Sequence, residues 1–516
     1  MPLWELALLI VGGLLAYELA RGFVLRKVQA SLHRRAKSFA EQHGVRVDLF
    51  KFGGRLLVKE ELLNDLVIQR AMLGAAQGTL PSTLKGGPPA APCRPEEIRR
   101  AVESYIDEIV PAFSLAAYYQ FGMTLAAAAI RAVYRPVIDA ASRERVRKEL
   151  PADATAVFVI NHRSNFDYVV VGWALARQVA VSYAVGEWAR VWPLDSLFKA
   201  FGGFFVRRGF PDPLYHTVLR RYLQLITRRG VTQGIFPEGG LTRDGALRSP
   251  KAGLLDAILQ LTTEPDFGRE LYFVPVGINY DRVLEDGSLL AEKRGKEHPP
   301  TPAEKLLNGA KLLYRIPWGA LVNVARAATG RLQRHGYVAV AFGRPVHWKE
   351  LAQQRNVDLA KLDDEARRNA AKDLAGELMK HIAQCIPATP VAMVARCMLE
   401  LSDCTRSDLT SKVLALRNEL LAKGIPLAMG GEFEEHKRVR AQLEEDAERN
   451  RDLSRMEGDM LAQDEAEAIA RLGVEHLARR RILQRTEDRV RVLPGEELKD
   501  LLVYYARSLA ALERSP

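Results

Sequence analysis

Cysteine is scarce in this sequence: the 516 residues include only Cys93, Cys385, Cys397 and Cys404. No two of them form a C-x2-C pair, so their spacing fits neither a zinc-binding set nor a disulfide framework. We therefore expect no metal site and a reducing compartment.

Runs of Lys and Arg of the kind that bind nucleic acid are also missing, although the chain is basic. Lys and Arg number 74 against 63 Asp and Glu, which gives a net charge of +11 and a sequence pI near 9.4. Such a balance suits an anionic lipid surface or a phosphorylated substrate. We rank nucleic acid last among the classes of partner and expect none.

The N-terminus lacks a full membrane span. Its uncharged core, Leu6–Tyr17, has 12 residues, whereas a helix needs about 20 to cross a bilayer. No basic stretch precedes it and no cleavage site follows, which argues against a signal peptide. The basic residues Arg21, Arg26 and Lys27 suit an anionic cytoplasmic leaflet. We expect an anchor or interfacial helix, with a core helix as the alternative.

A second apolar segment, Val110–Ile130, is uncharged over 21 residues, which is long enough to span. Its many alanines make it weakly hydrophobic, so a surface-lying or re-entrant helix and a buried helix stay open. The Gly- and Pro-rich stretch 78–92 is predicted to be a loop or linker. Residues 1–150 are thus predicted to form a helical, membrane-associated region.

From 151 to 350, β-prone runs alternate with helical stretches such as Tyr215–Thr227 and Leu254–Leu261. This alternation predicts an α/β domain with a central sheet. After 351 strand signals largely vanish, so 351–516 is predicted to be a helical region without chemistry, with helices at Leu359–Cys385 and Asp408–Lys423. The predicted strands are Ala156–Ile160, Val179–Ala184, Gly203–Val206, Val231–Phe236, Leu271–Tyr280 and Tyr337–Phe342.

One polar loop, Asn161–Asp167, joins the first strand to a predicted helix, Tyr168–Ala176. It places His162 five positions before Asp167. An imidazole titrates near neutral pH, and a carboxylate within reach fixes its tautomer and stabilises its protonated form. An isolated H-x4-D pattern is common by chance, so the blocks downstream decide its meaning.

Three further blocks of sequence carry residues that could bind a substrate or take part in catalysis. Arg207 and Arg208 end a glycine-flanked strand and can form forked hydrogen bonds to a phosphate, although a solvated basic turn is the simpler alternative. A glycine-rich turn follows the next strand, and a cation precedes the helix after it. The residues concerned are Glu238, Gly239, Gly240, Arg243 and Lys251. The last block, around Val274–Val276, is mostly a buried strand.

Together and in this order, these blocks resemble those of the glycerolipid acyltransferase superfamily over about residues 155–350. Asn161–Asp167 matches its H-x4-D block, and Gly202–Arg208 resembles G-x-F-F-x-R-R. Phe236–Gly240 matches F-P-E-G, and Val274–Val276 resembles V-P-V. The residues of these blocks are most similar to those of bacterial glycerol-3-phosphate 1-O-acyltransferases.

The resemblance implies an α/β fold with a central mixed sheet flanked by helices. It also implies acyl transfer from acyl-CoA or acyl-ACP to the sn-1 hydroxyl of glycerol 3-phosphate, at the cytoplasmic face of a bacterial inner membrane, with no other cofactor. His162 is the implied base and Asp167 its orienter. The implied substrate-binding residues are Arg207, Arg208, Glu238, Gly239, Gly240, Arg243 and Lys251.

One departure bears on the acceptor. After Gly240 the close relatives have Arg-Ser-Arg, whereas this chain has Leu241, Thr242 and Arg243, so one phosphate-directed cation is missing. Dihydroxyacetone phosphate and lysophosphatidic acid therefore stay open as acceptors. A non-catalytic membrane-binding scaffold with this fold is the alternative from another class, and an intact His162 and Asp167 argue against it. A serine hydrolase is disfavoured because no G-x-S-x-G elbow occurs.

Overall fold

The computed structural model describes residues 54–79, 94–113, 122–176, 181–186, 198–199, 201–207, 209–295, 334–429, 438–439, 442 and 451–512. The chain forms two compact units. Unit 1 draws on residues 1–121 and 175–232, and unit 2 on residues 122–174 and 233–516. Each unit combines segments that are distant in the sequence, and the division of the chain at residues 150 and 350 stays a prediction.

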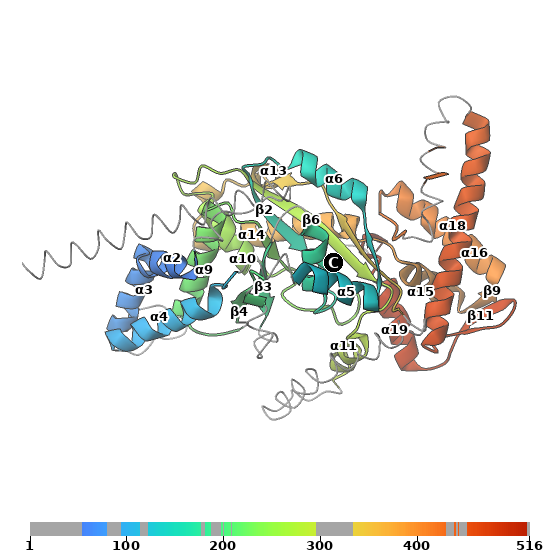
Figure 1. Ribbon diagram of the computed structural model, residues 1–516, viewed down its shortest axis with the longest axis horizontal. Coiled ribbons are helices and arrows are strands. Elements are labelled where there is room, and N and C mark those ends of the chain that lie inside the picture. Colours follow the sequence, from blue (N-terminus) through green and yellow to red (C-terminus); the bar gives the residue numbers. More distant parts are fainter. Residues whose placement is uncertain are drawn as a thin grey trace, which may run out of the picture. The chain divides into compact units, whose positions relative to one another are not determined.

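Unit 2 contains a mixed sheet in the order β1-β7-β6-β2-β5, with β8 beside β6. Figure 1 labels its two neighbouring strands β2 and β6. The central strand β2 is parallel to both β5 and β6, whereas β7 is antiparallel to β6 and parallel to β1. This sheet confirms the predicted fold class. The strands are β1 (Arg135–Ile138), β2 (Thr155–Ile160), β5 (Gln233–Ile235), β6 (Leu271–Tyr280), β7 (Tyr337–Phe342) and β8 (Val346–His347).

The strands β2, β6 and β7 are central because they are nearly continuous apolar runs. Every residue of β2 and β7 is buried, and Tyr272 alone in β6 is partly exposed. Strands covered on both faces do not need alternating polar positions. The predicted bounds of β6 and β7 are confirmed, whereas β1 was not predicted because its four residues, with Arg135 exposed and Pro136 next to it, form no apolar run.

Helices α10 (Gly253–Leu261) and α14 (Asp364–Cys385) pack on this sheet and form its main hydrophobic core. Val157 and Ile235 of the sheet meet Leu378 of α14 there. Each such side chain contributes about 1.5–3 kcal/mol on burial. Helices α5 (Met123–Val133), α6 (Ala140–Glu149) and α13 (Trp348–Gln354) also contact the sheet. Helices α7 (Asp167–Leu175) and α11 (Asp286–Lys293) follow β2 and β6 in the chain.

The C-terminal part of unit 2 is mainly helical, as predicted, but it also holds a small antiparallel sheet in the order β10-β11-β9. The prediction of a helical region is confirmed, and these three short strands were not among the predicted elements. These strands have three or four residues with few buried side chains, so they carry no apolar run. The elements are α15 (Pro390–Leu401), β9 (Asp403–Thr405), α16 (Arg406–Ala422), α18 (Arg451–Arg479), β10 (Leu483–Arg485), β11 (Arg489–Val492) and α19 (Glu496–Ala506).

Unit 1 is a helical assembly with one parallel strand pair, β3–β4. Asp65 caps the start of α3 and accepts a hydrogen bond from Arg221 of α9 (2.8 Å), which ties two helices together. The elements are α2 (Gly54–Leu63), α3 (Leu66–Gln77), α4 (Pro95–Ile109), β3 (Ser182–Gly186), β4 (Phe204–Val206) and α9 (Pro213–Arg228).

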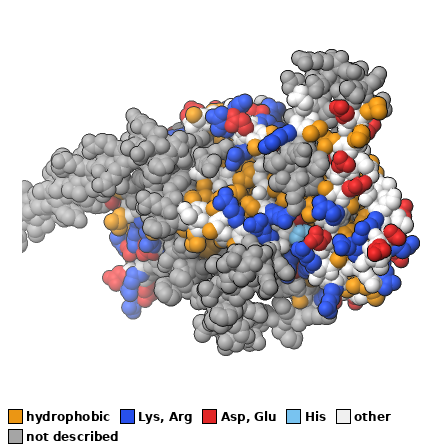
Figure 2. All heavy atoms as spheres, turned by 45° about the vertical axis from the view of Figure 1, so that its right-hand side comes forward, with side chains coloured by type: hydrophobic (Ala, Val, Ile, Leu, Met, Phe, Trp, Pro, Cys, Tyr) orange, Lys and Arg blue, Asp and Glu red, His pale blue; other side chains and the backbone are white. Residues whose placement is uncertain are grey.

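The two apolar segments are only partly described. Leu6–Tyr17 lies outside the described residues, as do residues 80–92 of the loop predicted at 78–92, and residues 114–121. Of the second segment, Val110–Phe113 is non-helical and α5 begins at Met123. Within the described ranges, no helix combines the length and hydropathy of a membrane span. Figure 2 shows Lys and Arg side chains spread among hydrophobic ones on the face turned to the viewer.

The contact between β6 and α14 makes a stability prediction. A Cβ added to Gly277 would lie 2.2 Å from the carbonyl oxygen of Cys385, whereas one added to Gly376 of α14 would meet no atom within 4 Å. We expect Gly277→Ala to lower the free energy of unfolding by about 1–3 kcal/mol through overpacking. Gly376→Ala should raise it by about 0.5–1 kcal/mol, because alanine favours a helix interior. Urea unfolding of both variants checks this, and equal effects would contradict it.

Candidate active site

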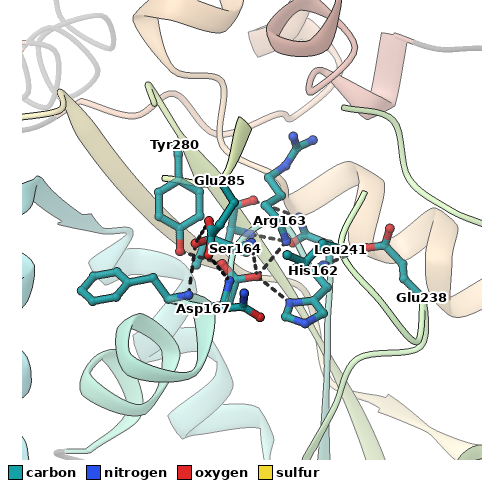
Figure 3. Close-up of polar contacts among 12 residues, drawn as sticks. His162, Arg163, Ser164, Asp167, Glu238, Leu241, Tyr280 and Glu285 are labelled. Carbon is teal, nitrogen blue, oxygen red and sulfur yellow. Dashed lines mark hydrogen bonds and ion pairs between the residues drawn. The ribbon is translucent and has the colours of Figure 1, made fainter. Parts of the chain in front are cut away.

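The loop Asn161–Asp167 leaves β2 at the carboxyl edge of the sheet, the edge at which α/β folds bind ligands. β5 and β6 are parallel to β2, with Val159 opposite Ile235 and Ile160 opposite Val276, so the chain leaves all three strands on the same side. Because β6 continues past that register to Tyr280, residues of three blocks meet around this loop (Figure 3).

His162 and Asp167 form the predicted pair. Nδ1 of His162 lies 2.9 Å from Oδ2 of Asp167, and both side chains are buried. An ionised carboxylate can only accept, so Nδ1 carries the proton and Nε2 keeps the lone pair. The imidazole packs against the ring of Phe236 at 4.3 Å between centroids. The pair is therefore oriented as a general base and its partner require.

The carboxylate of Asp167 binds more than the imidazole. Its Oδ2 accepts the backbone N–H groups of Arg163 (2.7 Å) and Ser164 (3.0 Å), and its Oδ1 accepts the hydroxyl of Tyr280 (2.6 Å). Burial, and after it the charge of Asp167, hold the pKa of Tyr280 well above its usual value, so the phenol stays a donor. Together with His162, four donors fix one carboxylate.

Glu285 holds the middle of the loop. Its carboxylate accepts the hydroxyl of Ser164 (2.7 Å) and the backbone N–H of Asn165 (3.1 Å). Asn161 anchors the start of the loop, because its side-chain amide exchanges two hydrogen bonds with the backbone of Ile278, at 3.0 and 2.8 Å. The loop is thus tied to β6 and to the chain that follows β6.

Glu238 is buried beneath the loop and is 1% exposed. One carboxylate oxygen accepts the backbone N–H of His162 (2.7 Å), and the other accepts that of Arg248 (2.9 Å). Burial raises the pKa of Glu238 to about 7, and these two amides oppose the rise. Both oxygens accept, so the geometry suits the ionised form, and the side chain joins the H-x4-D loop to the turn that follows β5.

The turn after Glu238 carries cations that differ in their partners and in their exposure to solvent. Arg243 is paired with Glu292 of α11, which compensates its charge. Lys251 is exposed, and its aliphatic stem covers Gly239, which has a φ of +62° and leaves no space for a Cβ. Arg248 donates from Nη1 to the carbonyl of Leu241 (3.1 Å). A guanidinium therefore lies beside the position at which the sequence lacks one.

Arg207 belongs to unit 1, so the structure does not place it relative to His162. Its Nε donates to Glu108 of α4 (2.8 Å), and its Nη2 also bonds this carboxylate, which lies in the same unit. The guanidinium lies 4.4 Å from the ring centroid of Phe210 and 5.5 Å from that of Tyr215. It is thus pre-organised with one edge taken by Glu108. Arg208 lies outside the described residues.

Three residues of this site had no assigned role in the sequence: Tyr280, Glu285 and Arg248. The predicted strand Leu271–Tyr280 contained the signal for Tyr280, because its length carries it past the end of β2. No comparable signal exists for Glu285, since it lies 121 positions from Ser164 in an irregular turn. Among the described residues, no group of His, Cys, Asp and Glu side chains is arranged to hold a metal ion.

Comparisons with known proteins give two family matches. Residues 142–279 match the family model described as Acyltransferase, and residues 320–471 match the one described as Glycerol-3-phosphate acyltransferase C-terminal region. Together they cover more than half of the chain. The chain is also similar to the structure of the 1-acyl-sn-glycerophosphate (LPA) acyltransferase PlsC from Thermotoga maritima, with 15% identity and a TM-score of 0.27 over 63% of this chain and 94% of that one.

The buried acid Glu238 predicts a pH dependence of stability. Its pKa is about 7 when folded and 4.5 by itself, so between these values the folded chain holds a proton that the unfolded chain has lost. The free energy of unfolding must then fall as pH rises, by at most about 1.4 kcal/mol per pH unit and about 3 kcal/mol in all. Glu238→Gln removes this component.

The measurement is urea unfolding of wild type and Glu238→Gln from pH 4.5 to 7.5. As pH rises to about 7, the free energy of unfolding of wild type should fall relative to that of the variant. Above pH 7 the difference between them should level off. A difference that stays constant with pH would show that Glu238 titrates in its ordinary range.

Proposed function

Because the chain belongs to the glycerolipid acyltransferase superfamily, nearest its glycerol-3-phosphate branch, we propose that it acylates the sn-1 hydroxyl of glycerol 3-phosphate. The donor is an acyl thioester, acyl-CoA or acyl-ACP, and the product is lysophosphatidic acid. This reaction is the first step of phospholipid synthesis.

The observation that carries the proposal is the contact of His162 with Asp167 at 2.9 Å in a buried loop. In the proposed reaction Nε2 takes the proton of the acceptor hydroxyl as its oxygen attacks the thioester carbonyl. The carbon–sulfur bond then breaks, the thiolate leaves, and the imidazolium returns the proton to it. Asp167 orients the ring and stabilises the imidazolium. A thioester is already activated, so no acyl-enzyme is required.

Three cationic side chains, one in unit 1 and two in unit 2, support a phosphorylated acceptor. Glu108 binds one edge of the Arg207 guanidinium, and in this proposal the other edge binds the phosphate. Arg248 and Lys251 lie on the turn that Glu238 joins to the H-x4-D loop. A planar guanidinium edge suits phosphate oxygens. In this proposal Arg248 supplies the cation that Leu241 does not. Dihydroxyacetone phosphate and lysophosphatidic acid carry the same phosphate and are the competing acceptors.

Membrane attachment is part of the proposal, because the acyl chain of the product lies in a bilayer. Two features support it: the apolar segments Leu6–Tyr17 and Val110–Ile130, and the net charge of +11, which suits an anionic cytoplasmic leaflet. Lys and Arg side chains lie among hydrophobic ones on the face in Figure 2. We place the protein at the cytoplasmic face of the inner membrane of a bacterium.

The direct test of the reaction uses His162→Ala and Asp167→Asn in membranes, with thiol release from acyl-CoA as the readout. Loss of the base should lower kcat by about 10²–10⁴-fold. Asp167→Asn should also be severely impaired, because the amide cannot accept all four donors. Wild-type rates in both variants would contradict the assignment of His162 as the base and Asp167 as its partner.

The acceptor is tested with Arg207→Ala, assayed with glycerol 3-phosphate, dihydroxyacetone phosphate and lysophosphatidic acid. The variant should raise the KM for the true acceptor by about tenfold or more, because a charged hydrogen-bond pair is lost, while kcat changes little. Arg221→Ala is the matched control, since Arg221 is also paired with a carboxylate of unit 1. An unchanged KM would remove Arg207 from the phosphate site.

A further inference from the structure

A first tie joins the H-x4-D loop to the segment that follows α19, and Arg163, the neighbour of His162, forms it. Arg163 is 2% exposed, and its guanidinium points away from the imidazole (Figure 3). Nη2 donates to the carbonyl of Gly245 (2.8 Å) and, at a longer 3.4 Å, to that of Ser508. A buried arginine needs partners, and two backbone carbonyls supply them for Nη2, whereas Nε has no hydrogen-bond partner among the described residues. Arg163 therefore joins three segments.

A second tie links the end of the chain to the turn after Glu238. Arg507 forms an ion pair with Asp244. Beside it, a Cβ on Gly245 would lie 1.8 Å from the carbonyl oxygen of Tyr504, so the last turn of α19 lies directly on this glycine. The turn that bears Arg248 and Glu238 is thus held in place by α19.

A third tie reaches the residues after β6. The hydroxyl of Tyr505 accepts the backbone N–H of Val283 (3.2 Å) and donates to Asp286, and Nη1 of Arg480 lies 2.9 Å from the same hydroxyl. Glu285, which holds Ser164 and Asn165 of the loop, lies between Val283 and Asp286 in the chain. Tyr505 thereby fixes the other support of the H-x4-D loop.

We infer that residues 504–508, here named the closing segment, are a positioning element of the active site. Arg507 and Tyr505 are its positioning residues: one fixes the turn of Glu238 through Asp244, and the other fixes the turn of Glu285. The segment thus contacts the turn that bears Glu238, at Asp244 and Gly245, and the residues on either side of Glu285, Val283 and Asp286. The C-terminal region thus serves the reaction, although the sequence assigned it no chemistry.

The consequence for the reaction falls mainly on the chemical step. A displacement of about 1 Å at a reacting group costs on the order of 10²-fold in rate. Loss of the closing segment should therefore lower kcat. Because the turn that it holds also bears Arg248, the KM for the phosphorylated acceptor should rise as well, whereas the KM for the acyl donor should stay nearly unchanged. This inference rests on the proposed function, because kcat is measured for acyl transfer.

The test compares Arg507→Ala, Asp244→Asn, the double variant and Arg507→Lys in the full chain. We expect kcat to fall by about tenfold or more in both single variants, with no further loss in the double variant, because the two residues act as one pair. Arg507→Lys keeps the charge and should restore most of the rate. Arg489→Ala is the control, since Arg489 also pairs with an acid, Asp403, in the C-terminal region but touches no support of the loop.

A second readout needs no activity. Hydrogen exchange of the peptide 161–168 should accelerate in Arg507→Ala and in Tyr505→Phe, which removes only a hydroxyl, and should stay at the wild-type rate in Arg489→Ala. Folded variants with unchanged kcat, or with unchanged exchange in this peptide, would overturn the inference. If wild type transfers no acyl group but the exchange responds, the proposed reaction fails and the positioning role stands.

Discussion

The carboxylate of Asp167 is the point on which the site depends. It accepts from the imidazole of His162, from two backbone amides of the loop and from the hydroxyl of Tyr280. The two amides close the loop into one conformation, and the same oxygen that receives them orients the imidazole. Loop shape and ring orientation are therefore set by one group. A buried carboxylate is stable as an anion only when its lone pairs are filled in this way.

A second buried acid, Glu238, does a different task with the same chemistry. Its two oxygens accept one backbone amide from each of two loops. Burial raises its pKa to about 7, and the two amides and the charge of Arg163 oppose the rise. Asp167 holds the imidazole of His162, whereas Glu238 joins the two loops.

Much of this arrangement could be predicted from the sequence, because strand and loop signals are local. The apolar runs gave β2, β6 and β7, and the polar block after β2 gave His162 and Asp167. Parallel pairing of β5 with β2 also brings Glu238 to the same edge. The supports Tyr280 and Glu285 could not be found in the same way, because they depend on register and on an irregular turn.

The C-terminal region marks the clearest limit of local patterns. Its strands β9, β10 and β11 are too short and too exposed to carry an apolar signature. Its helices have an ordinary amphipathic composition, and nothing in them predicts a contact with residues near 163 or 245. Those contacts arise from packing between distant segments, and only tertiary structure reveals them.

The contact of Arg163 with Ser508 spans 345 positions, and this has a consequence for the nascent chain. Synthesis runs from the N-terminus, so β2 and its loop leave the ribosome long before α19 exists. Until residues 504–508 have been synthesised, the guanidinium of Arg163 lacks one of its carbonyls and Gly245 lacks the backbone of Tyr504 beside it. A chain that stops early carries the complete set of sequence motifs but not the cover that holds them. The site is therefore completed only after residues 504–508 have been synthesised.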